Sequence, residues 1–140
     1  MKVCGVELKG SEAIICLLSL EQGLFEIPDC RTSRIAISKS TTTEEMRKFQ
    51  FDFAKLMEDY KVEQVVIKER MTKGKFAGGA VSFKLESAIQ LIKELNVDLI
   101  SATEIKETVK RNPMPVEFKA TGLKQFQEQA FTAAYAFLSK

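Results

Sequence analysis

The chain has 140 residues, of which 45 % are hydrophobic and 29 % are charged, a balance that suits one globular domain with a sizeable core. It contains no histidine, which excludes Ser-His-Asp triads, Cys-His nucleophile pairs and histidine-containing metal sites. The formal net charge of +2 is too small to indicate nucleic-acid binding by itself. Chemistry would have to come from carboxylates with a hard cation, from a lysine or from a backbone phosphate site.

The N-terminus and the cysteines indicate the compartment. The opening sequence MKVCGVELKG lacks the continuous apolar region of a signal peptide, and no run approaches the ~18 apolar residues of a membrane span. Cys4, Cys16 and Cys30 are odd in number and include no CxxC pair, so we expect reduced structural thiols. We therefore expect a cytoplasmic protein without a membrane partner.

The first twenty residues read as a β-hairpin. Residues 2–8 alternate between two faces, a turn follows at 9–11, and a nearly continuous apolar run completes the second strand. A glutamate, Glu7, lies inside the first strand. A longer connection contains a strand-like segment around 24–27 and leads to a short strand at 34–38.

Helices and strands then alternate. Thr41 or Thr42 can cap a helix with apolar residues at helical spacing, and the strand at 62–69 is of the buried, parallel type, so this helix is a crossover. A second helix follows, then a strand at 97–101 and a short helix that Thr103 can cap. The last helix occupies 123–140, and the order β-β-β-α-β-α-β-α-α predicts a single α/β domain over 1–140.

This order of elements places two carboxylates near each other. A right-handed crossover returns a parallel strand beside an earlier one, and if that neighbour is the first strand, Glu69 approaches Glu7. The carboxyl ends of parallel strands are where open α/β sheets build their sites. Two close carboxylates repel, so they require a cation, a shared proton or a basic neighbour.

Four stretches carry a resemblance to a known family: VCGVELKG, VVIKERMTKGKFAGGAVSFKLESA, TEIKETVK and the Ala-rich last helix. With the order of elements, they resemble the ribonuclease-H-like superfamily and in particular the bacterial Holliday-junction resolvase family. An uncharacterised bacterial family of the same fold is an alternative. The resemblance implies a five-stranded mixed sheet, with three antiparallel strands followed by parallel strands, flanked by helices.

The resemblance also implies chemistry. In that superfamily acidic side chains hold two Mg²⁺ or Mn²⁺ ions that cleave phosphodiester bonds. Carried over to this chain, Glu7 and Glu69 take the first two positions, and Glu128, the one carboxylate within the last helix, is the third candidate. The resolvases have two aspartates three apart at the start of that helix, where this chain offers mostly phenylalanine and glutamine, and Glu7 stands where most members have aspartate.

A basic loop follows the strand that ends near Glu69. The loop over residues 70–75 holds Arg70, Lys73 and Lys75 with no acidic residue. It precedes Gly78 and Gly79 at a helix start, where free amides favour anions. The loop does not match a P-loop. We expect these side chains to contact a nucleic-acid backbone, and an ordinary solvated loop is the alternative.

Two functions therefore remain open. One is a divalent-metal-dependent endonuclease acting on structured DNA or RNA through Glu7, Glu69 and Glu128. The other is a catalytically inactive ribonuclease-H-like module that binds nucleic acid or protein, in which the carboxylate cluster is imperfect or vestigial. Solvated surface positions are the alternative for Glu7 and Glu128 taken singly. A homodimer is a further expectation, because the resolvases are dimers and Phe51 falls off the apolar stripe of the first helix.

Overall fold

The computed structural model describes residues 1–38, 42–71 and 79–140. Its strands are β1 (Lys2–Lys9), β2 (Glu12–Glu21), β3 (Leu24–Glu26), β4 (Arg34–Ala36), β5 (Gln64–Lys68) and β6 (Asn96–Ile100). Its α-helices are α1 (Thr43–Asp59), α2 (Ala80–Gln90), α3 (Ala102–Arg111) and α4 (Glu128–Leu138), and two 3-10 helices, η1 (Phe118–Thr121) and η2 (Gln125–Gln127), precede α4.

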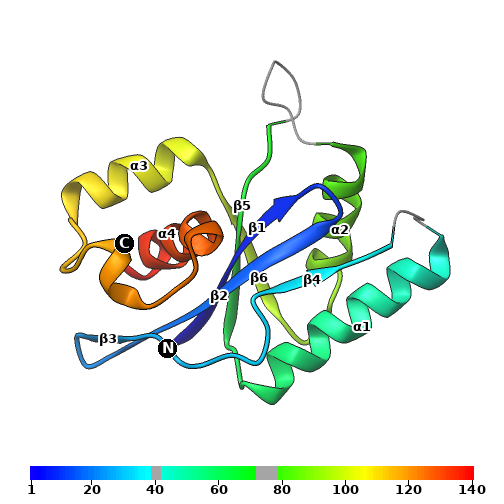
Figure 1. Ribbon diagram of the computed structural model, residues 1–140, viewed down its shortest axis with the longest axis horizontal. Coiled ribbons are helices and arrows are strands. Elements are labelled where there is room, and N and C mark those ends of the chain that lie inside the picture. The colour runs from blue at the N-terminus through cyan, green and yellow to red at the C-terminus, as the bar shows by residue number, and fades with distance from the viewer. Residues whose placement is uncertain (39–41, 72–78) are drawn as a thin grey trace.

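The described strands form one mixed sheet in the order β3-β2-β1-β5-β6. β1 pairs with β2 in antiparallel fashion and with β5 in parallel fashion, and β6 extends the parallel half. The sheet has six strands where five were expected, because both strand-like segments of the 24–38 region pair with the outer edge of β2, β3 at one end and β4 at the other. The α/β class and the mixed sheet are confirmed (Figure 1).

The predicted hairpin is present with a tight turn. Gly10 has φ +61, a left-handed conformation that glycine adopts without steric cost, so the chain reverses between Lys9 and Glu12. The register places Glu7 opposite Ile14. The pairing of β1 with β2 is therefore predicted by neighbouring residues alone, through the turn at Gly10.

The first crossover helix is also confirmed. The Thr42 hydroxyl accepts a hydrogen bond from the Glu45 amide at 3.3 Å, which satisfies one of the free N–H groups at the start of α1. The buried positions of α1 recur at helical spacing: Phe49, Phe53, Leu56 and Met57. None of the helices within the described ranges is long and apolar enough to cross a membrane.

Two helix ends differ from expectation. The short third helix begins after Ser101, whose hydroxyl accepts from the Glu104 amide at 3.1 Å, and Thr103 lies inside the helix. The last helix begins later than expected, since residues 125–127 form η2 before α4 starts at Glu128. In both places several polar residues could start a helix, and tertiary packing selected one.

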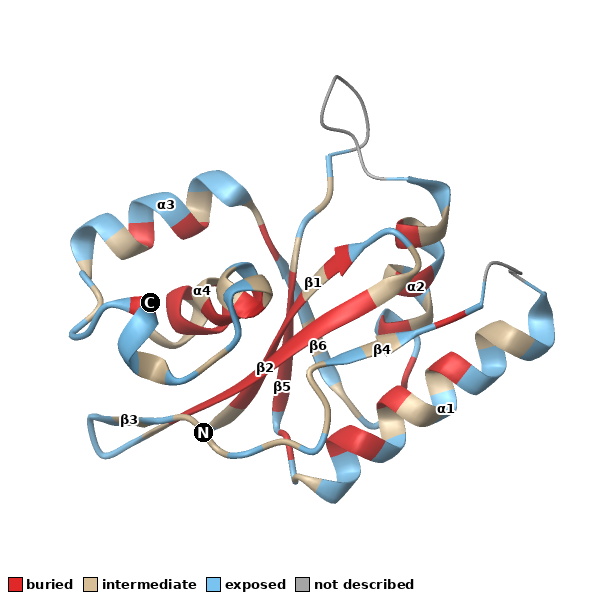
Figure 2. Cartoon of the chain, in the orientation of Figure 1, coloured by how far each residue is buried: buried red, intermediate tan, exposed pale blue. Residues whose placement is uncertain are grey.

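Helices cover both faces of the sheet, with α1 and α2 on one side and α3 and α4 on the other (Figure 1). Buried residues gather on the central strands and on the sheet-facing sides of the helices (Figure 2). The core on the α1–α2 face includes Cys4, Val6, Phe53, Ile67 and Leu85. The core on the α4 face includes Val3, Cys16, Val66, Ala130 and Phe131.

Candidate functional site at the carboxyl ends of β1 and β5

Glu7 lies on the face of the sheet that α4 covers. Val3 of the same strand belongs to the α4 core, and residues of a strand alternate between faces, so Gly5 and Glu7 point to the same side. Val6 pairs with Ile67 of β5, which places Lys68 beside Glu7 in the next position. Ile14 of β2 and Lys68 of β5 therefore flank the half-buried Glu7 on this face.

Lys68 is held by the first turn of α4. Its Nζ donates a hydrogen bond to Gln129 Oε1 at 2.6 Å. The same turn is fixed to the sheet by Gln127, whose Nε2 donates to the Ile15 carbonyl at 2.8 Å. The Lys68 ammonium group thus contacts a neutral amide at the start of the last helix.

Glu69 extends toward the other face. Its amide donates to the Ile100 carbonyl at 2.8 Å, so the backbone is still extended there, and alternation turns the exposed Glu69 side chain away from Glu7. Its electrostatic neighbour is Glu86 of α2. Burial raises the pKa of the Glu86 carboxyl above its ordinary value, and the Glu69 carboxylate raises it further.

Glu128, the third predicted ligand, is the half-buried first residue of α4. Its Oε1 accepts a hydrogen bond from Gln125 Nε2 at 2.9 Å. The start of this helix, where the resemblance implies two aspartates, has phenylalanine and glutamine side chains around Glu128.

The predicted nucleic-acid contacts are described in part. Arg70 is half-buried just beyond β5, and its Nε is one of two buried side-chain atoms in the described part of the chain without a hydrogen-bond partner, the other being Glu86 Oε2. Lys73 and Lys75 lie outside the described residues. Phe51, the predicted dimer contact, is 69 % exposed, and the dimer stays a prediction.

A pair of Mg²⁺ or Mn²⁺ ions, as the resemblance implies, would need several acidic side chains close together. Among the residues that the structure describes, no group of three or more Cys, Asp or Glu side chains is arranged to hold a metal ion. Lys68 beside Glu7 would repel a dication, and Gln129 adds no negative charge. The described residues do not fit a two-metal centre.

Sequence reasoning had concentrated on the acids and missed Lys68, Gln129 and Glu86. The signal for Lys68 was the alternation of VVIKE, because Lys68 and not Glu69 shares a face with Val66. Gln129 and Glu86 could not be found this way, since their positions depend on how α4 and α2 pack.

The cysteines behave as structural thiols: burial, with a contribution from Cys30, raises the pKa of Cys16 to about 12.

The sheet order, the parallel crossover and the helices on both faces define a ribonuclease-H-like α/β protein. The model superposes on Thermus thermophilus RuvC with a TM-score of 0.75 at 12 % sequence identity, covering 99 % of this chain and 94 % of RuvC. The same values hold for T. thermophilus RuvC in complex with a Holliday junction substrate. This likeness shows the fold.

The chain belongs to the family described as "Protein of unknown function (DUF3010)", whose model matches residues 1–137. No curated protein matches it.

Proposed function

We propose that this protein is a ribonuclease-H-like module that binds structured DNA or RNA without hydrolysing it. The observation that supports this proposal is the hydrogen bond to Gln129 from Lys68, the residue that follows the β5 partner of Val6. The cation on the strand that neighbours Glu7 therefore belongs to the protein itself. A lysine can contact a phosphate, but it cannot replace two metal ions that activate water and stabilise a leaving oxygen.

The binding surface in this proposal is the edge where β1 and β5 end. Ligands of open α/β sheets bind outside the carboxyl ends of the strands, and the exposed Lys9 and the half-buried Lys68 and Arg70 are the described cations closest along the chain to those ends. One RuvC relative of this fold was solved with a Holliday junction. The proposal extends that ligand class, a nucleic-acid phosphate backbone, to this chain.

The second candidate is the metal-dependent nuclease. Glu7 favours it, since a half-buried carboxylate near the end of β1 is where the resemblance implies the first metal ligand. The two candidates make opposite predictions about metal ions, which a matched pair of variants can separate.

The first experiment measures binding and cleavage together. Fluorescence anisotropy with labelled four-way junction, duplex, hybrid and single-stranded probes should show binding by the wild type that weakens with salt. Lys68→Ala should weaken binding roughly tenfold if one charge-assisted phosphate contact is lost. The matched control is Lys106→Ala, an exposed lysine of α3. No probe should be cut in Mg²⁺ or Mn²⁺.

The second experiment restores carboxylates. The double variant Lys68→Glu/Gln129→Asp should gain thermal stability from Mn²⁺, because a ligand that binds the native state stabilises it, whereas the wild type should gain none. Mn²⁺-dependent cleavage by the wild type that is lost in Glu7→Gln would overturn the non-hydrolytic proposal in favour of the nuclease. Absence of binding to every probe would remove nucleic acid as the ligand.

A further inference from the structure

Two adjoining cavities lie at the outer edge of β2, the edge that faces away from β1. β4 pairs with residues 12–14 of β2 and β3 pairs with residues 19–21, so residues 15–18 have no strand partner on this edge. The 27–34 connection and the 121–127 segment border this interruption instead. The recess is therefore a consequence of dividing one edge strand into two.

The larger recess, here called the cationic cavity, has a volume of about 550 Å³. Its walls are residues 15–17, 27–34, 121–124 and Gln127. Three cations, Arg31, Arg34 and Lys124, and one carboxylate, Asp29, line it. Asp59 and Glu12, outside the lining, pair with Arg31 and Arg34, so Lys124 is the lining cation without an ion pair among the described residues. An anionic group in the cavity can contact Lys124.

The cations of this cavity differ in how far they are already neutralised. Arg31 Nη2 lies 2.7 Å from Asp59 Oδ2, a close ion pair. Arg34 Nη1 is 3.5 Å from Glu12 Oε1, and its guanidinium lies 4.3 Å from the centre of the Phe126 ring. Lys124 Nζ is 5.8 Å from the same ring. Arg34 and Lys124 line the same cavity and both lie near the Phe126 ring, so they are the cations that a carboxylate entering this cavity can contact.

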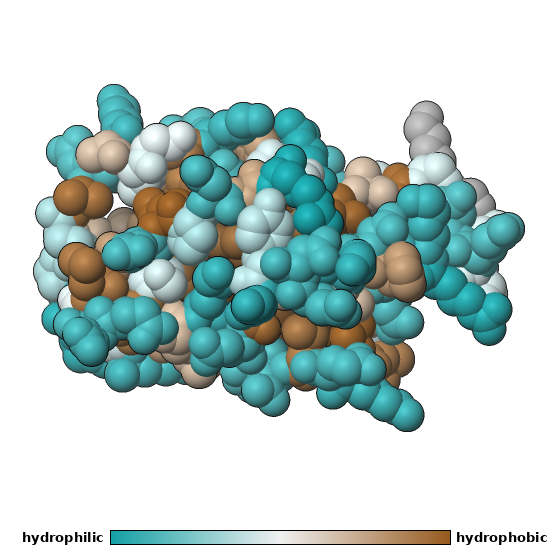
Figure 3. Space-filling model, turned by 90° about the horizontal axis from the view of Figure 1, so that it is seen from below, coloured by the Kyte–Doolittle hydropathy of each residue, from teal (hydrophilic) through white to brown (hydrophobic). Residues whose placement is uncertain are grey.

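The smaller recess, here called the apolar cavity, adjoins the first, because Ile27 and Thr121 line both. It has a volume of about 160 Å³, and a cavity of about this size accommodates a benzene ring. Its walls include Phe25, Met114, Val116, Phe131 and Tyr135. In the view from below, hydrophobic patches interrupt a mainly hydrophilic surface at the left, the side of the molecule that carries β3 (Figure 3).

The polar atoms of the apolar cavity are already engaged. The Tyr135 hydroxyl donates to the Asn112 carbonyl at 2.9 Å, and the Thr121 hydroxyl donates to the Phe118 carbonyl at 2.6 Å. A nucleobase inserted here would leave its polar groups without hydrogen-bond partners, which opposes its binding. An aliphatic or phenyl side chain carries no such groups, so the wall chemistry favours a peptide over a nucleotide.

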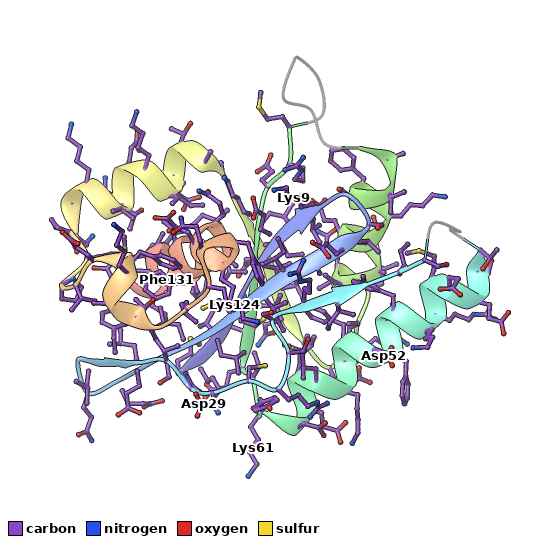
Figure 4. The ribbon with its side chains drawn as sticks, viewed as in Figure 1. Lys9, Asp29, Asp52, Lys61, Lys124 and Phe131 are labelled. Carbon is purple, nitrogen blue, oxygen red and sulfur yellow. The ribbon has the colours of Figure 1, made fainter. Side chains whose placement is uncertain are left out.

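We infer that this double cavity binds a segment of a partner protein in which an apolar side chain neighbours acidic residues. The apolar side chain fills the apolar cavity, and a carboxylate of the same segment contacts Arg34 and Lys124. Figure 4 labels Asp29 and Lys124, which line the cationic cavity, and Phe131, which lines the apolar cavity. The surface is distinct from the β1–β5 edge, so it can act whether or not that edge binds nucleic acid.

The test is fluorescence anisotropy with a labelled synthetic peptide in which one phenylalanine is flanked by aspartates. Two altered peptides replace the phenylalanine by alanine or the aspartates by asparagine. The protein variants are Arg34→Glu, Lys124→Glu and Val116→Asp; Val116 is 52 % exposed, so the fold should tolerate its replacement. Lys106→Glu, an exposed charge reversal outside both cavities, is the matched control. Thermal melts establish that each variant is folded.

We expect the acidic phenylalanine peptide to bind and each cavity variant to weaken it by roughly tenfold or more, with Lys106→Glu unchanged. Both altered peptides should lose binding. Failure of the acidic peptide to bind, or equal binding by all variants, would overturn the inference. Displacement of the peptide by a single-stranded oligonucleotide that depends on the same three residues would also overturn it and assign the cavity to nucleic acid.

Discussion

Gly5 shows how one residue fixes the position of a helix. A Cβ atom at this position would lie 2.0 Å from the Ala130 carbonyl oxygen and 3.0 Å from the Ala134 Cβ. The backbone of α4 can therefore rest directly on β1 only because residue 5 has no side chain. Through α4, this contact also positions Gln129 over Lys68, so a glycine in the first strand determines which groups surround Glu7.

Gly5→Ala should lower the free energy of unfolding by about 3 kcal/mol, at the upper end of what overpacking a core costs, because the contact is with backbone that cannot rotate away. Urea unfolding followed by circular dichroism measures the change. Gly79→Ala is the matched control, since a Cβ there meets no atom within 4 Å. Similar losses in both variants would contradict the close packing of α4 on β1.

Helix starts illustrate the scale of the element. Thr42 caps α1 as the sequence predicts, whereas Ser101 and not Thr103 caps α3. Both candidates for α3 are residues that can cap. The difference is that β6 runs directly into α3, so Ser101 is the residue with extended backbone, at φ −78 and ψ 157, when the helix begins.

Ser101→Ala should cost about 1 kcal/mol of stability, because the Glu104 amide loses its side-chain acceptor. Thr103→Ala should change stability by less than about 0.5 kcal/mol, since Thr103 is exposed inside the helix. Thermal melts of the two variants give the comparison. A larger loss of stability in Thr103→Ala than in Ser101→Ala would show that Thr103 caps α3.

At the scale of the whole molecule, one sheet separates two cores. The core under α1 and α2 and the core under α4 each take alternate residues of β1, β2 and β5. Loss of either layer would expose one face of the same strands to water. The two layers should therefore unfold together.

The two tyrosines allow this to be measured, because the chain has no tryptophan and each tyrosine reports one layer. Tyr60 packs against the α1–α2 core and Tyr135 lies in the α4 core. In urea, the tyrosine fluorescence of Tyr60→Phe and of Tyr135→Phe should change at the same midpoint as the circular dichroism of the same variant. A fluorescence transition that precedes the circular dichroism in one variant would show that one layer unfolds alone.

The sequence by itself determined the features that depend on neighbouring residues. The hairpin around Gly10, the capped crossover helix after Thr42 and the buried parallel strand follow from local periodicity and turn chemistry. The four stretches that resemble the resolvase family predicted the ribonuclease-H-like fold. It also drew attention to Glu7. The predicted roles of Glu7, Glu69 and Glu128 as ligands stay predictions.

Only the tertiary structure decided what surrounds those residues. Lys68 meets Gln129 across 61 positions of sequence, and the double cavity combines the 27–34 connection with segments about ninety residues later. Such contacts depend on where α4 packs, which Gly5 controls from the far end of the chain. Side-chain alternation can assign a residue to a face of the sheet, but it cannot say which helix covers that face, because the packing of helices on sheets is a property of the whole core.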